Sequence, residues 1–149
     1  MKKIIALQGK GNSGKSSTIR ALAELLIQKG ARPIKGVNFP EVVIGKTGKP
    51  RDFWQVFDWN GTQIGITSAG DTYKIIKDRL DDLEVNNSQI CVCACRTFDR
   101  KSKKGTIAAI QERTSYEVQF IKKTVDKNPL TQLSTNLGDA IALLNHLEN

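Results

Sequence analysis

The feature that most restricts the fold is a short apolar run followed at once by a glycine-rich loop and a helical pattern. Residues 4–7 (IIAL) are all apolar, as expected of a strand buried on both faces of a parallel sheet. Residues 9–14 contain three glycines. Apolar residues then recur at helical spacing from about Lys15 to Lys29, and Gly30 provides a stop signal. This order of strand, loop and helix is typical of α/β folds.

The composition narrows the class of protein further. The chain has 149 residues, of which 39% are hydrophobic and 26% charged, so we expect one soluble globular domain over residues 1–149. Lys and Arg number 23 against 15 Asp and Glu, and the resulting charge of +8 indicates an anionic partner. No apolar run approaches the ~18 to 20 residues of a membrane span, and the amino-terminal run is too short for a signal peptide.

The three cysteines lie within five residues and provide no disulfide framework. Cys91, Cys93 and Cys95 alternate along one apolar run, so all three should face the same side of a strand, where we expect them to pack in the core. A zinc site would need further ligands, and the only histidine, His146, is expected at a helix end. A reducing cytoplasm is therefore the expected location.

A hairpin is predicted near the middle of the chain. Two strand-like runs, 53–59 and 62–67, flank Asn60 and Gly61, a pair that favours a type I′ turn. Trp54 and Trp59 have opposite parity and should point to opposite faces of their strand.

The remaining segments alternate between helical and strand patterns. We predict helices over 72–83 and 106–113, strands over 90–95 and 117–121, and a last helix opened by Asn128-Pro129. The apolar stripe expected on that helix comprises Leu133, Leu137, Ala140, Ile141 and Leu144. Residues 32–52 are expected to form a long loop with a short strand at 41–44. The predicted fold is a three-layer α/β domain with a mostly parallel sheet, one hairpin, and helices on both faces.

The glycine-rich loop contains the pattern that most directly indicates a binding site. Residues 9–16 (GKGNSGKS) fit the pattern G-x-x-x-x-G-K-[ST] at every fixed position, after a buried strand and at the start of a helix. Glycines let backbone N–H groups turn inward around a polyphosphate, and the helix N-terminus adds partial positive charge. Lys15 is expected to reach the β- and γ-phosphates and Ser16 to ligate Mg²⁺. The predicted binding residues are Gly9, Lys10, Gly11, Asn12, Ser13, Gly14, Lys15, Ser16 and Ser17.

These residues resemble the Walker A motif of P-loop NTPases, a resemblance that implies a P-loop fold, a nucleoside triphosphate and Mg²⁺. Residues 10–17 (KGNSGKSS) also resemble the deviant Walker A of partition and septum-site ATPases, although Asn12 replaces that group's usual second glycine. In that group the early lysine, here Lys10, reaches the nucleotide of a dimer partner, which implies a homodimer. The alternative is that Lys10 is a solvated loop residue.

The family's acidic residue is missing from its expected place. P-loop NTPases carry a carboxylate at the end of a neighbouring strand to hold the Mg²⁺ shell, and Thr67 stands there in this chain. Asp71 is the first candidate to supply that carboxylate, with a helix N-cap as its alternative role. Asp58 is a weaker candidate.

A basic loop follows the strand at 90–95. In open α/β sheets, ligands bind beyond the carboxyl ends of the strands, so residues 96–106 should reach the phosphates. Arg96 is the first choice for stabilising charge in phosphoryl transfer, followed by Arg100 and Arg113. A flexible solvated loop is the alternative, and Phe98 among these cations also suits a single-stranded nucleic acid.

Three functions remain open at this stage. Because the family's guanine-selecting Asn-Lys-x-Asp is absent after either late strand, ATP is favoured over GTP. The chain is expected to be an ATPase, or a small-molecule or nucleotide kinase whose basic loops at 32–52 and 96–106 hold an anionic acceptor. The third function is a nucleotide-switched module that binds protein or nucleic acid with little hydrolysis.

Overall fold

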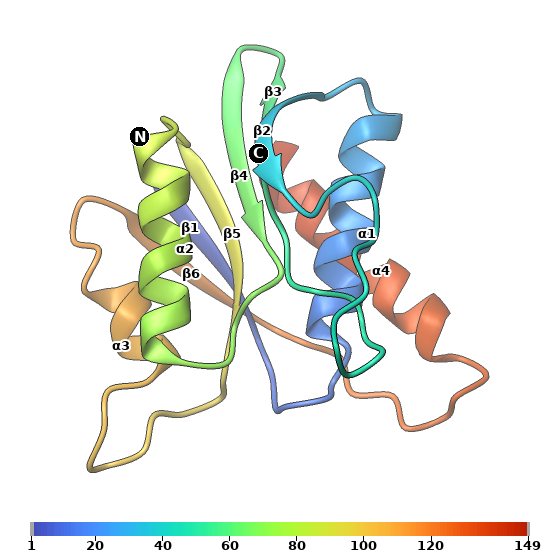
Figure 1. Ribbon diagram of the computed structural model, residues 1–149, viewed down its shortest axis with the longest axis vertical. Coiled ribbons are helices and arrows are strands. Elements are labelled where there is room, and N and C mark those ends of the chain that lie inside the picture. The colour runs from blue at the N-terminus through green and yellow to red at the C-terminus, as the bar shows by residue number, and fades with distance from the viewer. Residues whose placement is uncertain (1, 149) are drawn as a thin grey trace.

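The computed structural model describes residues 2–148, which form an α/β structure with helices on both faces of one sheet (Figure 1). The strands are β1 (Lys3–Gln8), β2 (Arg32–Val37), β3 (Trp54–Trp59), β4 (Thr62–Thr67), β5 (Ile90–Cys95) and β6 (Glu117–Lys122). The helices are α1 (Lys15–Gln28), α2 (Tyr73–Val85), α3 (Thr106–Gln111) and α4 (Gln132–Glu148).

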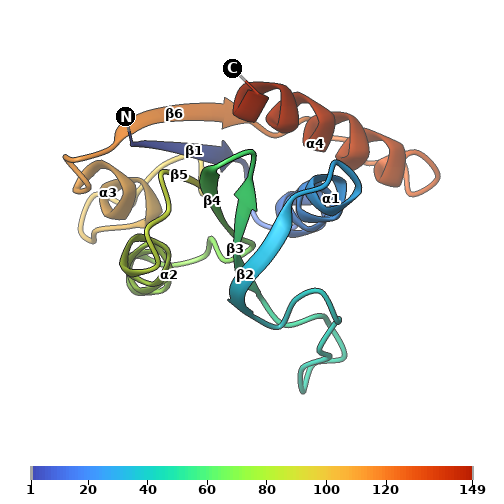
Figure 2. The same cartoon turned by 90° about the horizontal axis from the view of Figure 1, so that it is seen from above.

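The sheet is mixed and mostly parallel. Its strand order is β2-β3-β4-β5-β1-β6, in which β4, β5, β1 and β6 run parallel and β3 is antiparallel to both neighbours. Helices α1 and α4 cover one face, and α2 and α3 cover the other (Figure 2). The predicted three-layer α/β arrangement with one β3–β4 hairpin is therefore confirmed.

Strand β1 lies at the centre of two hydrophobic clusters. Ile5 and Leu7 pack with α1 and α4, whereas Ile4 and Ala6 pack with α2 and α3. All four side chains are fully buried, which confirms the prediction of a strand covered on both faces. Trp54 packs in the cluster with α2 and α3, and Trp59 packs against the cluster with α1 and α4. The two side chains therefore point to opposite faces of β3, as predicted.

The hairpin turn follows the sequence prediction. Asn60 and Gly61 have φ values of 53° and 84°, and a type I′ turn needs positive φ at both positions. The turn fixes the register between β3 and β4, so that Trp54 lies opposite Thr67.

The prediction for residues 32–52 is wrong in two respects. A strand forms at Arg32–Val37, where a loop was expected, whereas Ile44 in the expected strand makes only an isolated bridge with Pro50. All six residues of β2 are exposed, because β2 is an edge strand that pairs only with β3. Strand β2 therefore lacks the alternation of buried and exposed residues that a sequence pattern can detect, unlike the other edge strand, β6.

The prediction for the last helix is wrong in its start and in its buried face. Helix α4 begins at Gln132, after a turn in which the Asn128 carbonyl accepts hydrogen bonds from the amides of residues 131 and 132. The buried residues of α4 are Ala140, Leu143, Leu144 and Leu147, whereas Leu133, Leu137 and Ile141 are 80%, 44% and 46% exposed. The amino-terminal half of α4 extends past α1, so it has little to pack against (Figure 2).

Candidate functional site

The glycine-rich loop lies at the edge where the parallel strands end. It joins β1 to α1, and the Gly9 amide donates to the Cys95 carbonyl at the end of β5 (3.1 Å). On the other side of β1, the Lys123 amide after β6 donates to the Gln8 carbonyl (2.8 Å). The sequence-predicted segments 9–17 and 96–106 therefore meet at one edge of the sheet (Figure 1).

Side chains of neighbouring residues occupy the space beside the glycines of the loop. A Cβ at Gly9 would lie 2.8 Å from the Ser13 hydroxyl oxygen, and a Cβ at Gly11 would overlap the guanidinium of Arg96. Gly14 has φ +92° and Asn12 has φ +59°. Asn12 thus adopts a left-handed backbone conformation. Glycine favours this conformation, and asparagine tolerates it with less steric strain than most other residues.

Lys15 is folded onto the loop. It is only 7% exposed, and its Nζ donates to the carbonyl oxygens of Gly9 and Lys10, both at 2.7 Å. Burial lowers the pKa of Lys15, and the nearby cation of Arg96 lowers it further. This ammonium is held mainly by neutral carbonyls, so an anion entering the loop would be a stronger partner.

The start of α1 faces the same space. Gly14 provides no side-chain cap, and the first turn contains no acidic residue, so its N–H groups keep their capacity to bind an anion. Ser16 and Ser17 are exposed. The Ser16 hydroxyl donates to the Ser68 carbonyl at 3.4 Å, whereas the Thr18 hydroxyl is turned back to the Gly14 carbonyl (2.8 Å).

Arg96 and Asp71 form an ion pair beside the loop. Arg96 Nη2 lies 3.1 Å from Asp71 Oδ1, with the two side chains 41% and 64% exposed. The alternative role for Asp71 as a helix N-cap is wrong, because the Thr72 hydroxyl accepts the hydrogen bond from the Ile75 amide at the start of α2 (3.3 Å).

The basic loop is anchored at both ends. The Arg96 amide donates to the Thr106 hydroxyl (2.9 Å), and the Asp99 carboxylate accepts from the amides of Ile107 (3.1 Å) and Ala108 (2.9 Å). Asp99 therefore fixes the loop to the start of α3. The exposed residues between these anchors include Arg100, Lys101 and Lys103.

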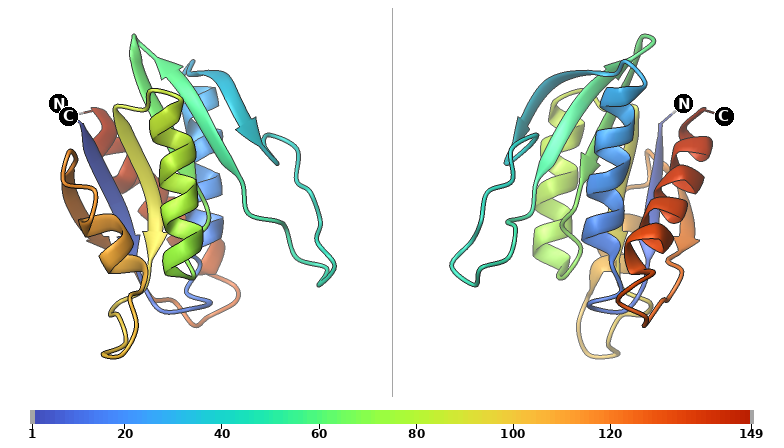
Figure 3. Two further views of the ribbon diagram at one scale, coloured as in Figure 1. Left: turned by 60° about the vertical axis from the view of Figure 1, so that its left-hand side comes forward. Right: turned by 90° about the vertical axis from the view of Figure 1, so that its right-hand side faces the viewer.

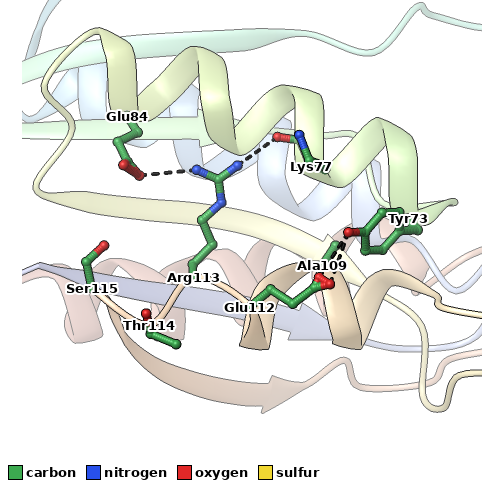
Figure 4. Close-up of a pocket in the computed structure, with 8 residues that line it drawn as sticks. All are labelled: Tyr73, Lys77, Glu84, Ala109, Glu112, Arg113, Thr114 and Ser115. Atoms are coloured by element: carbon green, nitrogen blue, oxygen red, sulfur yellow. Dashed lines mark hydrogen bonds and ion pairs between the residues drawn. The ribbon is translucent and has the colours of Figure 1, made fainter.

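Arg113 lies away from the loop. Its guanidinium pairs with Asp81 and Glu84 near the end of α2, in a pocket between α2 and α3 (Figure 4). The end of α2 leads to the start of β5, which is the opposite edge of the sheet from the loop. Arg113 joins the two helices there, so it does not lie beside the loop with Arg96, and the prediction that placed it there is wrong.

A carboxylate that the sequence analysis did not consider lies at the site. Asp52 precedes the antiparallel strand β3, so it lies beside the end of β4, and the Ser68 hydroxyl donates to its Oδ1 (3.1 Å). Burial raises the pKa of Asp52. The hairpin register set by Asn60-Gly61 was the signal that could have placed it there. Asp58, the weaker candidate, lies at the other end of β3 and pairs with Arg32 (3.1 Å).

A second ion pair, largely buried, lies beside the loop on the side of β6. The Lys123 side chain is fully buried, and its Nζ lies 2.7 Å from Asp139 Oδ2 on α4. Burial opposes ionisation of Asp139, but hydrogen bonds from Lys123 and Thr124 hold its pKa below the usual range. A Cβ at Gly9 would lie 3.0 Å from the Lys123 Cβ, so Lys123 is packed directly against the glycine-rich loop.

The cysteines are core residues, as predicted. All three are free thiols in the cluster with α2 and α3, and burial raises the pKa of Cys91 and of Cys95 to about 12. Within residues 2–148, no group of three or more His, Cys, Asp or Glu side chains is placed to hold a metal.

Comparisons with known proteins add no relatives. No family model matches the chain, and searches of curated proteins and of solved structures found no match either. Among the helices formed by residues 2–148, none has the length and apolar character needed to cross a membrane.

Proposed function

We propose that this protein is a P-loop NTPase-like domain that binds Mg²⁺-ATP at Gly9–Ser17 and transfers its terminal phosphoryl group to water or to a small acceptor. The observation that carries the proposal is the position of Lys15. Its ammonium is buried and donates to two loop carbonyls, at the start of a helix with no acidic residue in its first turn. A triphosphate supplies the negative charge that this arrangement lacks.

The residues present also fit Mg²⁺. Ser16 lies exposed in the first turn of α1, and its hydroxyl makes a long 3.4 Å contact with the Ser68 carbonyl that a metal could replace. Ser16 would hold the metal together with phosphate oxygens, which explains why no larger cluster of protein ligands is required. When bound, Mg²⁺ neutralises charge on the terminal phosphates.

Lys15 and Arg96 supply the protein's positive charge. Lys15 would exchange its two carbonyl partners for the β- and γ-phosphates, and Arg96, already lying over Gly11, would face the charge that develops during transfer. Both groups already lie at the loop, but Lys15 would give up its two carbonyl partners and Arg96 its ion pair with Asp71 when the ligand binds.

A kinase is the second candidate, because the loop bearing Arg100, Lys101 and Lys103 lies at the same edge of the sheet. The connection between β2 and β3, with Lys46 and Lys49, also extends toward this edge (Figure 3). Exposed cations on two loops beside a phosphate site suit an anionic acceptor. ADP release that is stimulated by phosphorylated or carboxylated small molecules would favour the kinase over the ATPase.

The test is calorimetric titration of ATP and of GTP, with and without Mg²⁺, into the wild type and Lys15→Ala. We expect Mg²⁺-dependent ATP binding that is lost in Lys15→Ala and retained in Lys29→Ala, a control at the exposed end of the same helix. Circular dichroism verifies that each variant is folded. Undiminished ATP affinity in folded Lys15→Ala would contradict the proposal.

A further inference from the structure

We infer that Asp52 is the carboxylate that orders the metal shell at Ser16, in place of the acidic residue missing at position 67. The inference rests on the proposed function and deepens it by assigning a positioning residue. Asp52 comes from the antiparallel strand next to β4, so it reaches the site from a different segment than the family resemblance implies.

Thr67, which stands where the family resemblance implies an acidic residue, already makes another hydrogen bond. Thr67 is fully buried, and its hydroxyl donates to the Phe53 carbonyl at 3.0 Å. Asp71 is held by Arg96 (3.1 Å). Thr67 therefore offers no carboxylate, and the Asp71 carboxylate is already paired with Arg96 through its Oδ1.

Ser68 connects Asp52 to Ser16 through two contacts. Its backbone carbonyl accepts the Ser16 hydroxyl at 3.4 Å, and its own hydroxyl donates to Asp52 Oδ1 at 3.1 Å. The orientation of Ser68 is fixed, because its Oγ also accepts the Phe53 amide (2.9 Å). One carboxylate oxygen of Asp52 is thus anchored, while Oδ2 accepts no hydrogen bond from residues 2–148. A water molecule bound to the metal can donate to that second oxygen.

The surrounding charges are consistent with an added cation. Burial raises the pKa of Asp52, and the neighbouring carboxylate of Asp71 raises it further. The cations of Arg20 and Arg79 partly offset this effect, but neither forms a hydrogen bond with Asp52, and the Arg20 guanidinium lies 4.7 Å from the Phe53 ring centre. A divalent ion beside Asp52 would favour the charged carboxylate further.

The experiment compares the Mg²⁺-dependent gain in ATP affinity between Asp52→Asn and a matched control. Asp58→Asn makes the same charge change at the opposite end of β3. We expect Asp52→Asn to bind ATP without Mg²⁺ as tightly as the wild type does. The increase in its ATP affinity on addition of Mg²⁺ should be about tenfold smaller than in the wild type, as is common when a group that orients metal ligands is removed. Asp58→Asn should keep the full gain. The electron paramagnetic resonance spectrum of Mn²⁺ in the ATP complex provides a readout independent of turnover.

The outcomes separate this inference from the proposed function. A full Mg²⁺-dependent gain in Asp52→Asn overturns the assignment, and loss of the gain in Asp71→Asn instead returns the role to Asp71. Absence of any Mg²⁺-dependent binding in the wild type overturns the proposed function and this assignment together. If Asp52→Asn does not fold, Asp52→Ser replaces it with the same expectation, because the Asp52 backbone oxygen, not its side chain, accepts the hydrogen bond from Asn38 (3.0 Å).

Discussion

Arg96 is held against the glycine-rich loop by Asp71: the ion pair measures 3.1 Å, and the guanidinium occupies the space where a side chain at Gly11 would lie. The pair joins the end of β5 to the segment that leads into α2. A bound triphosphate would compete with Asp71 for Arg96, so Asp71 sets part of the energetic cost of engaging the nucleotide.

We therefore expect Asp71→Asn to bind ATP more tightly, by about fivefold, since a partly exposed ion pair is worth on the order of 1 kcal/mol. Arg96→Gln should bind less tightly. Isothermal titration calorimetry at fixed ionic strength measures both effects. Weaker binding by Asp71→Asn would show that Asp71 serves the metal and not Arg96.

Gly14 should be required for binding as well as for folding. Its φ of +92° lies in the left-handed region, and a Cβ would come within 2.6 Å of the Asn136 side-chain oxygen. We expect Gly14→Ala to destabilise the protein by roughly 1–2 kcal/mol and to weaken ATP binding more than tenfold. Gly61→Ala is the control, because Gly61 also has positive φ (+84°) but lies in the hairpin turn with open space around it. Equal binding losses in both variants would contradict a specific role for Gly14.

Replacing a leucine by alanine should have different effects on stability on the two faces of α4. Leu143 is fully buried and Leu133 is 80% exposed. We expect Leu143→Ala to lower the free energy of unfolding by about 2–5 kcal/mol and Leu133→Ala to change it by less than about 0.5 kcal/mol. Urea denaturation measures both values. A large loss in Leu133→Ala would mean that the outer face of α4 is covered in solution.

The Lys123–Asp139 pair should make stability depend on acid pH. Because the pKa of Asp139 is lower in the folded protein than its ordinary value of 3.8, this carboxylate stabilises the fold above about pH 4. The contribution is lost as pH falls from there through the folded-state pKa. Asp139→Asn should be destabilised by about 3 kcal/mol at pH 7, since the buried Lys123 loses its partner, and should show a shallower loss of stability below pH 4. Thermal unfolding from pH 7 to pH 2 tests this; parallel curves for the two proteins would contradict it.

The three thiols should be unreactive in the folded protein. The pKa of Cys91 and of Cys95 is raised to about 12, and that of the fully buried Cys93 is raised as well, all chiefly by burial, so almost no thiolate forms at pH 8. We expect negligible reaction with Ellman's reagent in native buffer and three reactive thiols in urea. Rapid modification of one thiol in the native state would show that β5 is more accessible than its packing indicates.

The sequence by itself determined the elements whose signals are local. The run at residues 4–7 identified β1, the Asn60-Gly61 pair identified the hairpin, and the alternation of Cys91, Cys93 and Cys95 identified one packed face of β5. Each of these signals reflects a backbone conformation or a burial pattern that the residues themselves favour. The same reasoning failed for β2, which is exposed along its whole length and is defined only by its pairing with β3.

Which side chains meet at the glycine-rich loop depends on how distant segments are arranged in the fold. Arg96 and Asp71 are 25 residues apart, and Asp52 reaches Ser68 because β3 runs antiparallel to β4. The buried face of α4 was likewise set by where the helix crosses α1, because Leu133 and Leu143 are equally apolar and only one of them finds neighbours. Contacts between distant segments depend on strand order and helix placement, which no local pattern encodes.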